Sequence, residues 1–259
     1  MDKQLSNLKR FNLIMGSVHF VQGVLMLFLS STVIEKIGEF KPQIIQFYQT
    51  FNVNTMSLET VSKELFSLPF GIMVASFLLI SALAHFLVYM LSDQYFKGLK
   101  QNINRFRWFE YALSSSIMIV LIATLFGIYD IGTLILIFIT NASMNLFGLV
   151  MEELNSNKKP KDLSWGPFIW GCIAGLGPWI VILSYMFGTG NFDMVPWFVW
   201  AIVGSYFVTF NTFPINMILQ YKQVGKWKDY LYGERVYIIL SLVAKTILAW
   251  LVLFGAMQP

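Results

Sequence analysis

One lysine stands in the middle of a long apolar segment close to the C-terminal end of the chain. Lys245 lies in ILSLVAKTILAWLVLFG, about ten residues past Arg235, so its Cα should lie about 15 Å from the nearer end of a helix. A charged side chain at that depth of a membrane is costly unless it is paired or faces an interior cavity. A desolvated amine also condenses readily with an aldehyde. We therefore expect covalent chemistry at Lys245, with a buried salt bridge or an ion pathway as the alternative.

Glu110 is the natural partner of this lysine. It lies in RFRWFEYALSSS, close to the same end of another apolar segment. Because long helical side chains lean toward the N-terminus of their helix, the amine of Lys245 should reach the layer of Glu110. A carboxylate there would stabilise a protonated nitrogen. The alternative is a surface pair of Glu110 with Arg107, three residues earlier on the same helix.

Two histidines and two serines should lie in the same layer. His19 and His85 fall in the same half of the first two apolar segments, and an imidazole titrates near neutrality, which suits a transient proton acceptor. Ser241 precedes Lys245 by one helical turn, and Ser114 follows Glu110 by one turn, so both hydroxyls can join the cluster. The alternatives are structural histidines and serines that bond to their own helix backbone.

The elements that must hold these residues are transmembrane helices. Hydrophobic residues make up 56% of the 259-residue chain and charged residues 12%, against about a quarter charged in soluble domains. A single cysteine, Cys172, excludes an internal disulfide. We predict an all-α membrane protein, one seven-transmembrane-helix domain over residues 1–259, with the first segment an uncleaved anchor rather than a signal peptide. The apolar runs are about 8–29, 66–92, 106–128, 131–151, 165–187, 195–220 and 234–257.

Orientation follows from the basic residues, which are enriched on the cytoplasmic side of membrane proteins. Three lysines fall in the first outer loop, Lys36, Lys41 and Lys63. Fourteen of the 18 lysines and arginines fall in four short segments on the other side: Lys3, Lys9, Arg10, Lys97, Lys100, Arg105, Arg107, Lys158, Lys159, Lys161, Lys222, Lys226, Lys228 and Arg235. We therefore expect the N-terminus in the cytoplasm and the C-terminus outside the cell. This spread of charge needs no nucleic acid to explain it.

Two connections are distinctive. Only Gly127, Tyr129, Asp130 and Gly132 interrupt the third and fourth segments, so we expect a tight turn there. The long extracellular first loop, about residues 30–64, contains IIQFYQTFNV, which mixes β-branched and aromatic residues with polar ones. This composition predicts a β-hairpin. The hairpin would cap the bundle or mediate dimer contacts, or else serve as an ordered linker.

Taken together, these features resemble a heliorhodopsin. The apolar last helix with its central lysine and the third helix with a carboxylate at its inner end carry the resemblance. So do SWGPFIWGCIAGLGPWIVI in the fifth segment and the aromatic and asparagine pattern of YFVTFNTFPINMILQY in the sixth. The resemblance covers essentially the whole chain, and the predicted cytoplasmic N-terminus agrees with this family.

The resemblance implies a cofactor, retinal, all-trans in the dark and joined to Lys245 as a Schiff base. It implies Glu110 as the counter-ion, Ser241 and Ser114 in the counter-ion network, and His19 and His85 in an inner polar cavity. It also implies a homodimer. Residues implied to line the polyene, for which ordinary helix packing is the alternative, are Asn141, Met144, Pro178, Trp179, Phe207, Phe210 and Asn211.

The choice between a pump and a sensor rests on missing carboxylates. Proton-pumping rhodopsins place a second carboxylate one turn before the retinal lysine and a pair on the third helix. Here Ser241 and Leu121 occupy those places, and beyond Glu110 no clear carboxylate is expected within a span. We therefore expect a photosensor with a slow photocycle and an unidentified cytoplasmic signalling partner. The alternatives are a light-driven proton or ion conductor, or a seven-helix membrane protein that binds no retinal. No catalytic or metal-binding motif is recognisable, so we expect no enzyme.

Overall fold

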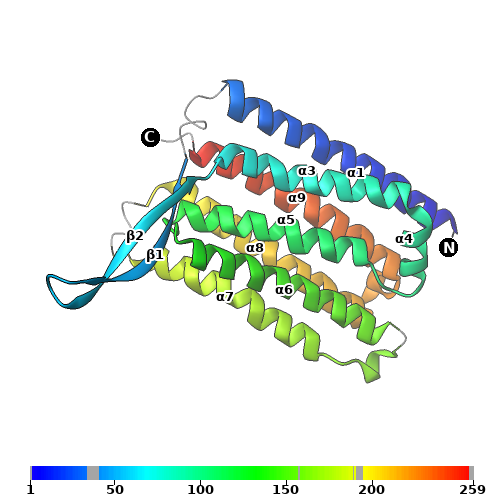
Figure 1. The fold of residues 1–259 in the computed structure, drawn as a ribbon. Coiled ribbons are helices and arrows are strands. Elements are labelled where there is room, and N and C mark those ends of the chain that lie inside the picture. Colours follow the sequence, from blue (N-terminus) through cyan, green and yellow to red (C-terminus); the bar gives the residue numbers. More distant parts are fainter. Residues whose placement is uncertain (1, 34–40, 157, 189, 191–194, 257–259) are drawn as a thin grey trace.

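The computed structural model describes residues 2–33, 41–156, 158–188, 190 and 195–256. Seven of its helices are long and apolar enough to cross a membrane, and they form one bundle with the two termini at opposite ends (Figure 1). The α-helices are α1 (Asp2–Phe28), α3 (Phe70–Met90), α4 (Ser92–Lys100), α5 (Arg105–Leu125), α6 (Ile131–Asn155), α7 (Gly166–Gly188), α8 (Trp197–Tyr221) and α9 (Tyr230–Ala256). Short helical turns are η1 (Leu29–Val33), η2 (Pro160–Asp162) and η4 (Gly225–Lys228).

The seven predicted spans are confirmed, with shifts at their ends. Helix α1 begins at Asp2 and α9 at Tyr230, earlier than the apolar runs, because polar residues continue both helices beyond the apolar stretch. Helix α3 begins only at Phe70, since residues 57–67 before it form a strand. The short α4, which follows α3 almost directly, was not predicted.

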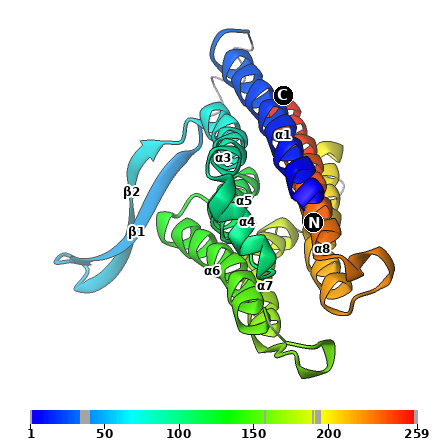
Figure 2. The ribbon, with the colours of Figure 1, turned by 90° about the vertical axis from the view of Figure 1, so that its right-hand side faces the viewer.

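The predicted β-hairpin is present in the first long connection. Strand β1 (Gln43–Asn52) pairs antiparallel with β2 (Ser57–Ser67). Its base is fixed to the bundle by a hydrogen bond from the Ile45 amide to the Tyr129 carbonyl, 3.0 Å long. Beyond that base the hairpin projects away from the helices (Figures 1 and 2). Residues 30–33 of the predicted loop belong to η1, and residues 34–40, with Lys36, lie outside the described residues.

The tight turn between α5 and α6 is also confirmed. Gly127 adopts a φ of 80°, which a residue without a side chain tolerates best. Asp130 then caps α6 by accepting a 2.7 Å hydrogen bond from the Thr133 amide. This turn returns the chain directly from one span into the next.

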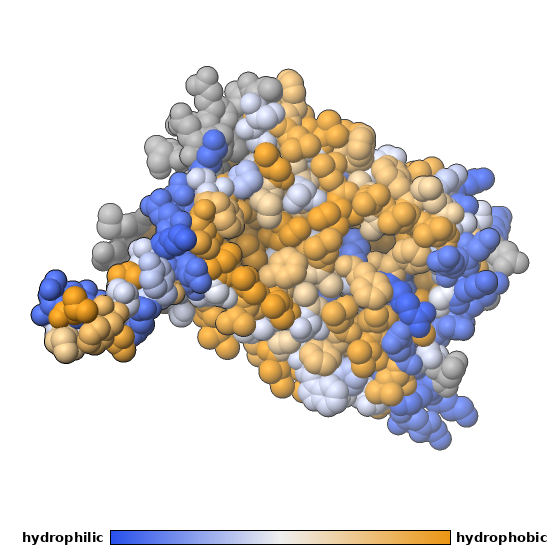
Figure 3. Space-filling view, in the orientation of Figure 1, coloured by the Kyte–Doolittle hydropathy of each residue, from blue (hydrophilic) through white to orange (hydrophobic). Residues whose placement is uncertain are grey.

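The helices differ in how much of their surface lies inside the protein. In its most apolar stretch α5 is 61% buried and forms the centre of the bundle, whereas α8 is only 11% buried. A broad band of apolar side chains covers the helical surface, with hydrophilic residues gathered at the N-terminal end of the bundle and on the hairpin (Figure 3). A lipid environment around this band is therefore required.

Candidate functional site

The side chain of Lys245 is paired with that of Glu110 inside the bundle. The Lys245 Nζ donates a hydrogen bond to Glu110 Oε1 at 2.5 Å and another to Ser241 Oγ at 3.0 Å. The two charged side chains are 4% and 8% exposed. Ser81 of α3, which sequence reasoning missed, donates a 2.6 Å hydrogen bond to the same Glu110 oxygen. Three helices thus meet at one buried ion pair.

Ser81 had a sequence signal that was overlooked. It precedes His85 by one helical turn, so both residues lie on the same face of α3. Ser114 lies one turn after Glu110 on α5, as expected, and is fully buried.

The two histidines come together beside this pair. His19 of α1 and His85 of α3 stack with ring centroids 5.6 Å apart and an interplanar angle of 14°. Gly16 permits this approach, because a Cβ at that position would lie 2.8 Å from the Cβ of His85. The Nδ1 of His85 lies 2.8 Å from Asn12 Oδ1, and His85 shares a small cavity with Glu110.

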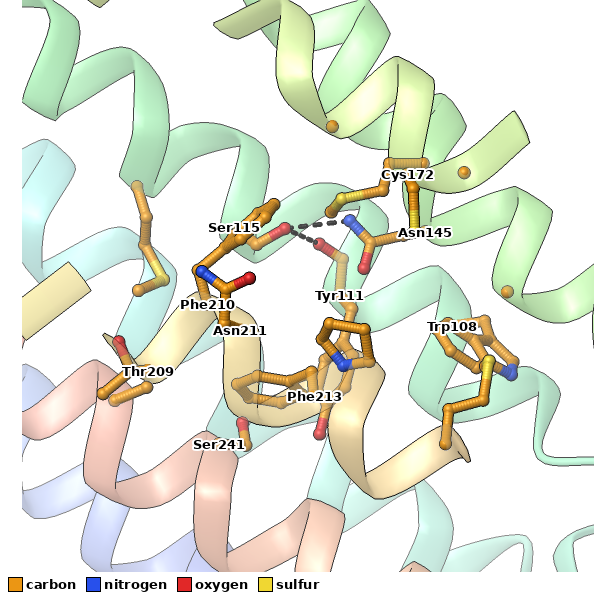
Figure 4. Close-up of a pocket in the computed structure, with 18 of the residues that line it drawn as sticks. Trp108, Tyr111, Ser115, Asn145, Cys172, Thr209, Phe210, Asn211, Phe213 and Ser241 are labelled. Carbon is orange, nitrogen blue, oxygen red and sulfur yellow. Dashed lines mark hydrogen bonds between the residues drawn. The ribbon is translucent and has the colours of Figure 1, made fainter. Parts of the chain in front are cut away.

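A larger cavity begins at Lys245 and extends among α5, α6, α7, α8 and α9. Its volume is about 260 Å³, close to the lower end of ordinary ligand pockets. Its wall is mostly apolar and aromatic, with polar groups at a few places. Figure 4 shows one of these places, where Ser115 bonds to the Tyr111 carbonyl and accepts from Asn145.

The residues proposed to line the polyene divide into two groups. Met144, Phe210 and Asn211 belong to the cavity wall, as do the residues Tyr111, Ser115 and Asn145, which the sequence analysis missed. Asn145 follows Asn141 by one turn, a spacing that would have indicated it. The wall in the described part of the chain does not include Asn141, Pro178, Trp179 or Phe207.

These four residues support the wall or flank it. Asn141 is buried and donates to Ser115 at 2.8 Å. Trp179 packs against Phe210 with ring centroids 5.7 Å apart, directly after the buried Pro178. Phe207, which is 54% exposed, also packs against Trp179, with ring centroids 5.5 Å apart.

Arg107 does not pair with Glu110, so the surface pair considered from the sequence is wrong. The Arg107 guanidinium instead contacts the carboxylates of Glu152 and Glu234. Both glutamates are buried, within α6 and α9. The expectation that no carboxylate beyond Glu110 lies within a span is therefore also wrong. The apolar runs end just before Glu152 and begin at Glu234, so both residues had been assigned to the span ends.

The residues around Lys245 fit an aldehyde cofactor. Lys245 opens onto the apolar cavity, and a carboxylate is within hydrogen-bond distance of its nitrogen. On the cavity wall, a Cβ at Gly175 would lie 2.5 Å from Met144 Sδ and 3.2 Å from Phe210 Cζ. An amine, a counter-charge and a slot kept open by a glycine suit an elongated apolar aldehyde.

The comparison with protein families decides the assignment. The family model described as Heliorhodopsin matches residues 8–257, nearly the whole chain. This chain belongs to the heliorhodopsin family. A comparison with curated proteins gives no match. Family membership makes this a multi-pass retinal photoreceptor-type membrane protein, in a family of light-sensing proteins rather than a known class of enzymes.

Removing the negative partner of the buried ion pair should destabilise the protein. We expect Glu110→Gln to lower the free energy of unfolding of the retinal-free protein by about 3 kcal/mol, because it leaves a buried ammonium unpaired. Adding Lys245→Met should recover much of that loss. Thermal denaturation of the two single variants and the double variant measures this coupling. Glu153→Gln, which removes an exposed pair with Arg105, is the control and should change little. Additive effects of the two substitutions would contradict the pairing.

A larger side chain at Gly175 tests whether the apolar cavity holds the chromophore. Gly175→Val should reduce the yield of retinal pigment, because the new side chain displaces Met144 and Phe210 into the cavity. Gly177→Val is the matched control: it has the same helix-propensity cost, but a Cβ there meets nothing within 4 Å. The absorbance of the reconstituted protein gives the yield. Equal yields from the two variants would show that the cavity does not hold the chromophore.

Proposed function

We propose that this protein is a sensory photoreceptor in which retinal, all-trans in the dark, is held by Lys245 as a protonated Schiff base. The observation that supports this proposal is the buried contact of 2.5 Å between Lys245 Nζ and Glu110 Oε1 at the end of an apolar cavity. When bound, retinal supplies visible-light absorption and a change of shape on illumination. The chain's own residues determine where the proton on the nitrogen resides.

Glu110 would serve as the counter-ion. Condensation with an aldehyde leaves a single hydrogen on Lys245 Nζ, and two acceptors compete for it: Glu110 at 2.5 Å and Ser241 at 3.0 Å. The ionised carboxylate is the stronger acceptor. Ser81 donates to the same carboxylate and helps to hold it in place. Ser114 would complete this network from the next turn of α5.

His19 and His85 would hold or receive the proton when it leaves Lys245. Each imidazole has a ring nitrogen that can accept a proton, the two rings stack on each other, and His85 shares a small cavity with Glu110. Because the proton would remain in this interior layer, we infer a slow photocycle that shifts a conformational equilibrium without pumping ions. An unidentified cytoplasmic partner would read that change.

The orientation and assembly follow as parts of the proposal. The basic residues near the N-terminal end of the bundle support a cytoplasmic N-terminus, an extracellular C-terminus and an outer hairpin, within a single domain. Homodimerisation is supported by the hairpin, where Phe47 and Phe51 lie on one face and are 52% and 53% exposed. Exposed apolar clusters of this kind mark contact surfaces.

The attachment of retinal to Lys245 can be tested by visible absorption spectroscopy. Purified protein supplied with all-trans-retinal should form a visible absorption band, and Lys245→Ala should abolish it because the amine is absent. Lys63→Ala, on the exposed hairpin, is the control and should keep the band. A band that survives Lys245→Ala would refute the attachment site.

Electrical recording separates the sensor from a light-driven conductor built on the same frame. We expect illumination of membranes containing the wild-type pigment to produce no sustained photocurrent, because Ser241 stands one turn before Lys245, where a proton pump carries a carboxylate. Patch-clamp recording at several voltages makes the measurement, with the Lys245→Ala protein as the baseline. A sustained current above that baseline would favour the conductor.

A further inference from the structure

The side chain of Asn12 connects α1 with two other helices at a buried point. Asn12 is 3% exposed. Its Nδ2 donates a 2.9 Å hydrogen bond to the carbonyl of Leu8, one turn earlier on α1, and a long one of 3.5 Å to the hydroxyl of Tyr95 on α4. Its Oδ1 lies 2.8 Å from Nδ1 of His85 on α3. The proposed function assigns a role to His85 and none to Asn12.

These contacts fix the direction in which the amide of Asn12 faces. A carbonyl oxygen only accepts hydrogen bonds, so the group that faces the Leu8 carbonyl is the NH₂ of the amide. The amide oxygen therefore faces His85. Because this oxygen is also only an acceptor, the hydrogen in the 2.8 Å contact belongs to Nδ1 of His85.

The tautomer of His85 follows from this contact. A neutral imidazole carries a hydrogen on one ring nitrogen and a lone pair on the other. With the hydrogen on Nδ1, the lone pair lies on Nε2, so Nε2 is the atom of His85 that can accept a proton. The other tautomer would bring two lone pairs together at a buried site, and the unmade hydrogen bond makes it unfavourable.

The second histidine lacks such an anchor. His19 is buried, and within the described part of the chain neither of its ring nitrogens has a hydrogen-bond partner. Its stacking contact with His85 joins the ring faces, so it does not select a tautomer. His85 also lines the small cavity together with Asn12 and Glu110, whereas the described wall of that cavity does not include His19. The two imidazoles are therefore not equivalent.

We propose that Asn12 is a positioning residue that holds His85 in the Nδ1–H tautomer and thereby makes Nε2 of His85 the atom that receives the displaced proton. The use of this proton rests on the proposed function. The N–H bond at Lys245 Nζ breaks and leaves its electron pair on Nζ. The proton passes by way of Glu110 and forms a new N–H bond at Nε2, which makes the ring an imidazolium. Asn12 Oδ1 accepts from Nδ1 before and after this step, and the reverse transfer restores the starting state.

The tautomer can be measured without retinal. The chain has only two histidines, so nitrogen-15 histidine labelling of the retinal-free protein in lipid bilayers gives two pairs of ring-nitrogen signals in solid-state NMR. His19→Phe assigns them. At alkaline pH, where both imidazoles are neutral, His85 of the wild type should show a protonated Nδ1 and a bare Nε2.

Two substitutions at Asn12 test the cause of this tautomer. Asn12→Leu keeps the volume but removes the acceptor, so His85 should change to the Nε2–H form or to a mixture. Asn12→Asp keeps an acceptor and should retain the Nδ1–H form. Asn155→Leu is the control, because Asn155 makes the same type of bond to the carbonyl one turn earlier, on α6. Its His85 signals should equal those of the wild type.

The kinetics of the pigment give a second measure. After a light flash, the visible band reports the loss of the proton from Lys245 Nζ and its return. In Asn12→Asp, a carboxylate beside Nδ1 stabilises the imidazolium of His85, so the return should be about tenfold slower. In Asn12→Leu, the imidazolium loses its acceptor, and the return should be about threefold faster.

The outcomes separate this proposal from the proposed function. A wild-type His85 in the Nε2–H form, or His85 signals that are the same in Asn12→Leu and the wild type, would refute the role of Asn12 whether or not pigment forms. A normal rate of return in an Asn12→Asp pigment that retains the tautomer would refute Nε2 as the receiving atom. A wild-type protein that forms no pigment would refute the proposed function, while the NMR signals would still decide the role of Asn12.

Discussion

The ion pair between Lys245 and Glu110 constrains the rest of this structure. A lone ammonium or carboxylate in the apolar interior would be strongly unfavourable, so each charge requires the other. That requirement brings α5 and α9 together at one level, and Ser81 adds α3 to the same point. The histidine pair, the small cavity that His85 shares with Glu110 and the larger apolar cavity all adjoin this contact. The function proposed for the protein depends on it equally.

Helix α5 organises the polar interior. Arg107, Glu110 and Ser114 follow one another at spacings of three and four residues, so they lie along one face of the helix. Tyr111 and Ser115 lie beside them and face the apolar cavity. It is consistent with this role that α5 is the most buried of the seven spans. A single helix thereby carries Arg107 with its two buried carboxylate partners, the counter-charge of Lys245 and part of the wall of the apolar cavity, and it sets the distances between them.

The spans could be predicted from hydropathy, and the hairpin from the composition of its strands. The pairing of Lys245 with Glu110 could be predicted because an isolated buried charge is energetically costly. Ser81 and Asn145 were missed although each lies one turn from a residue already chosen. The contacts of Arg107 with Glu152 and Glu234 could not be predicted from the sequence, for a different reason. Glu152 and Glu234 stand at the ends of apolar runs, where charges are usually solvated, and only the packing of three helices shows that these are buried. Likewise, helical spacing could not separate wall residues such as Phe210 from those behind the wall, such as Trp179.

The low burial of α8 has a consequence for the chromophore environment. This helix contributes Phe210 and Asn211 to the cavity, yet most of its surface faces away from the protein. Its position therefore depends on the thickness of the surrounding acyl chains as well as on contacts with its neighbours. The bilayer therefore borders the proposed retinal cavity, and its composition is one of the variables expected to tune the spectrum of a chromophore bound there.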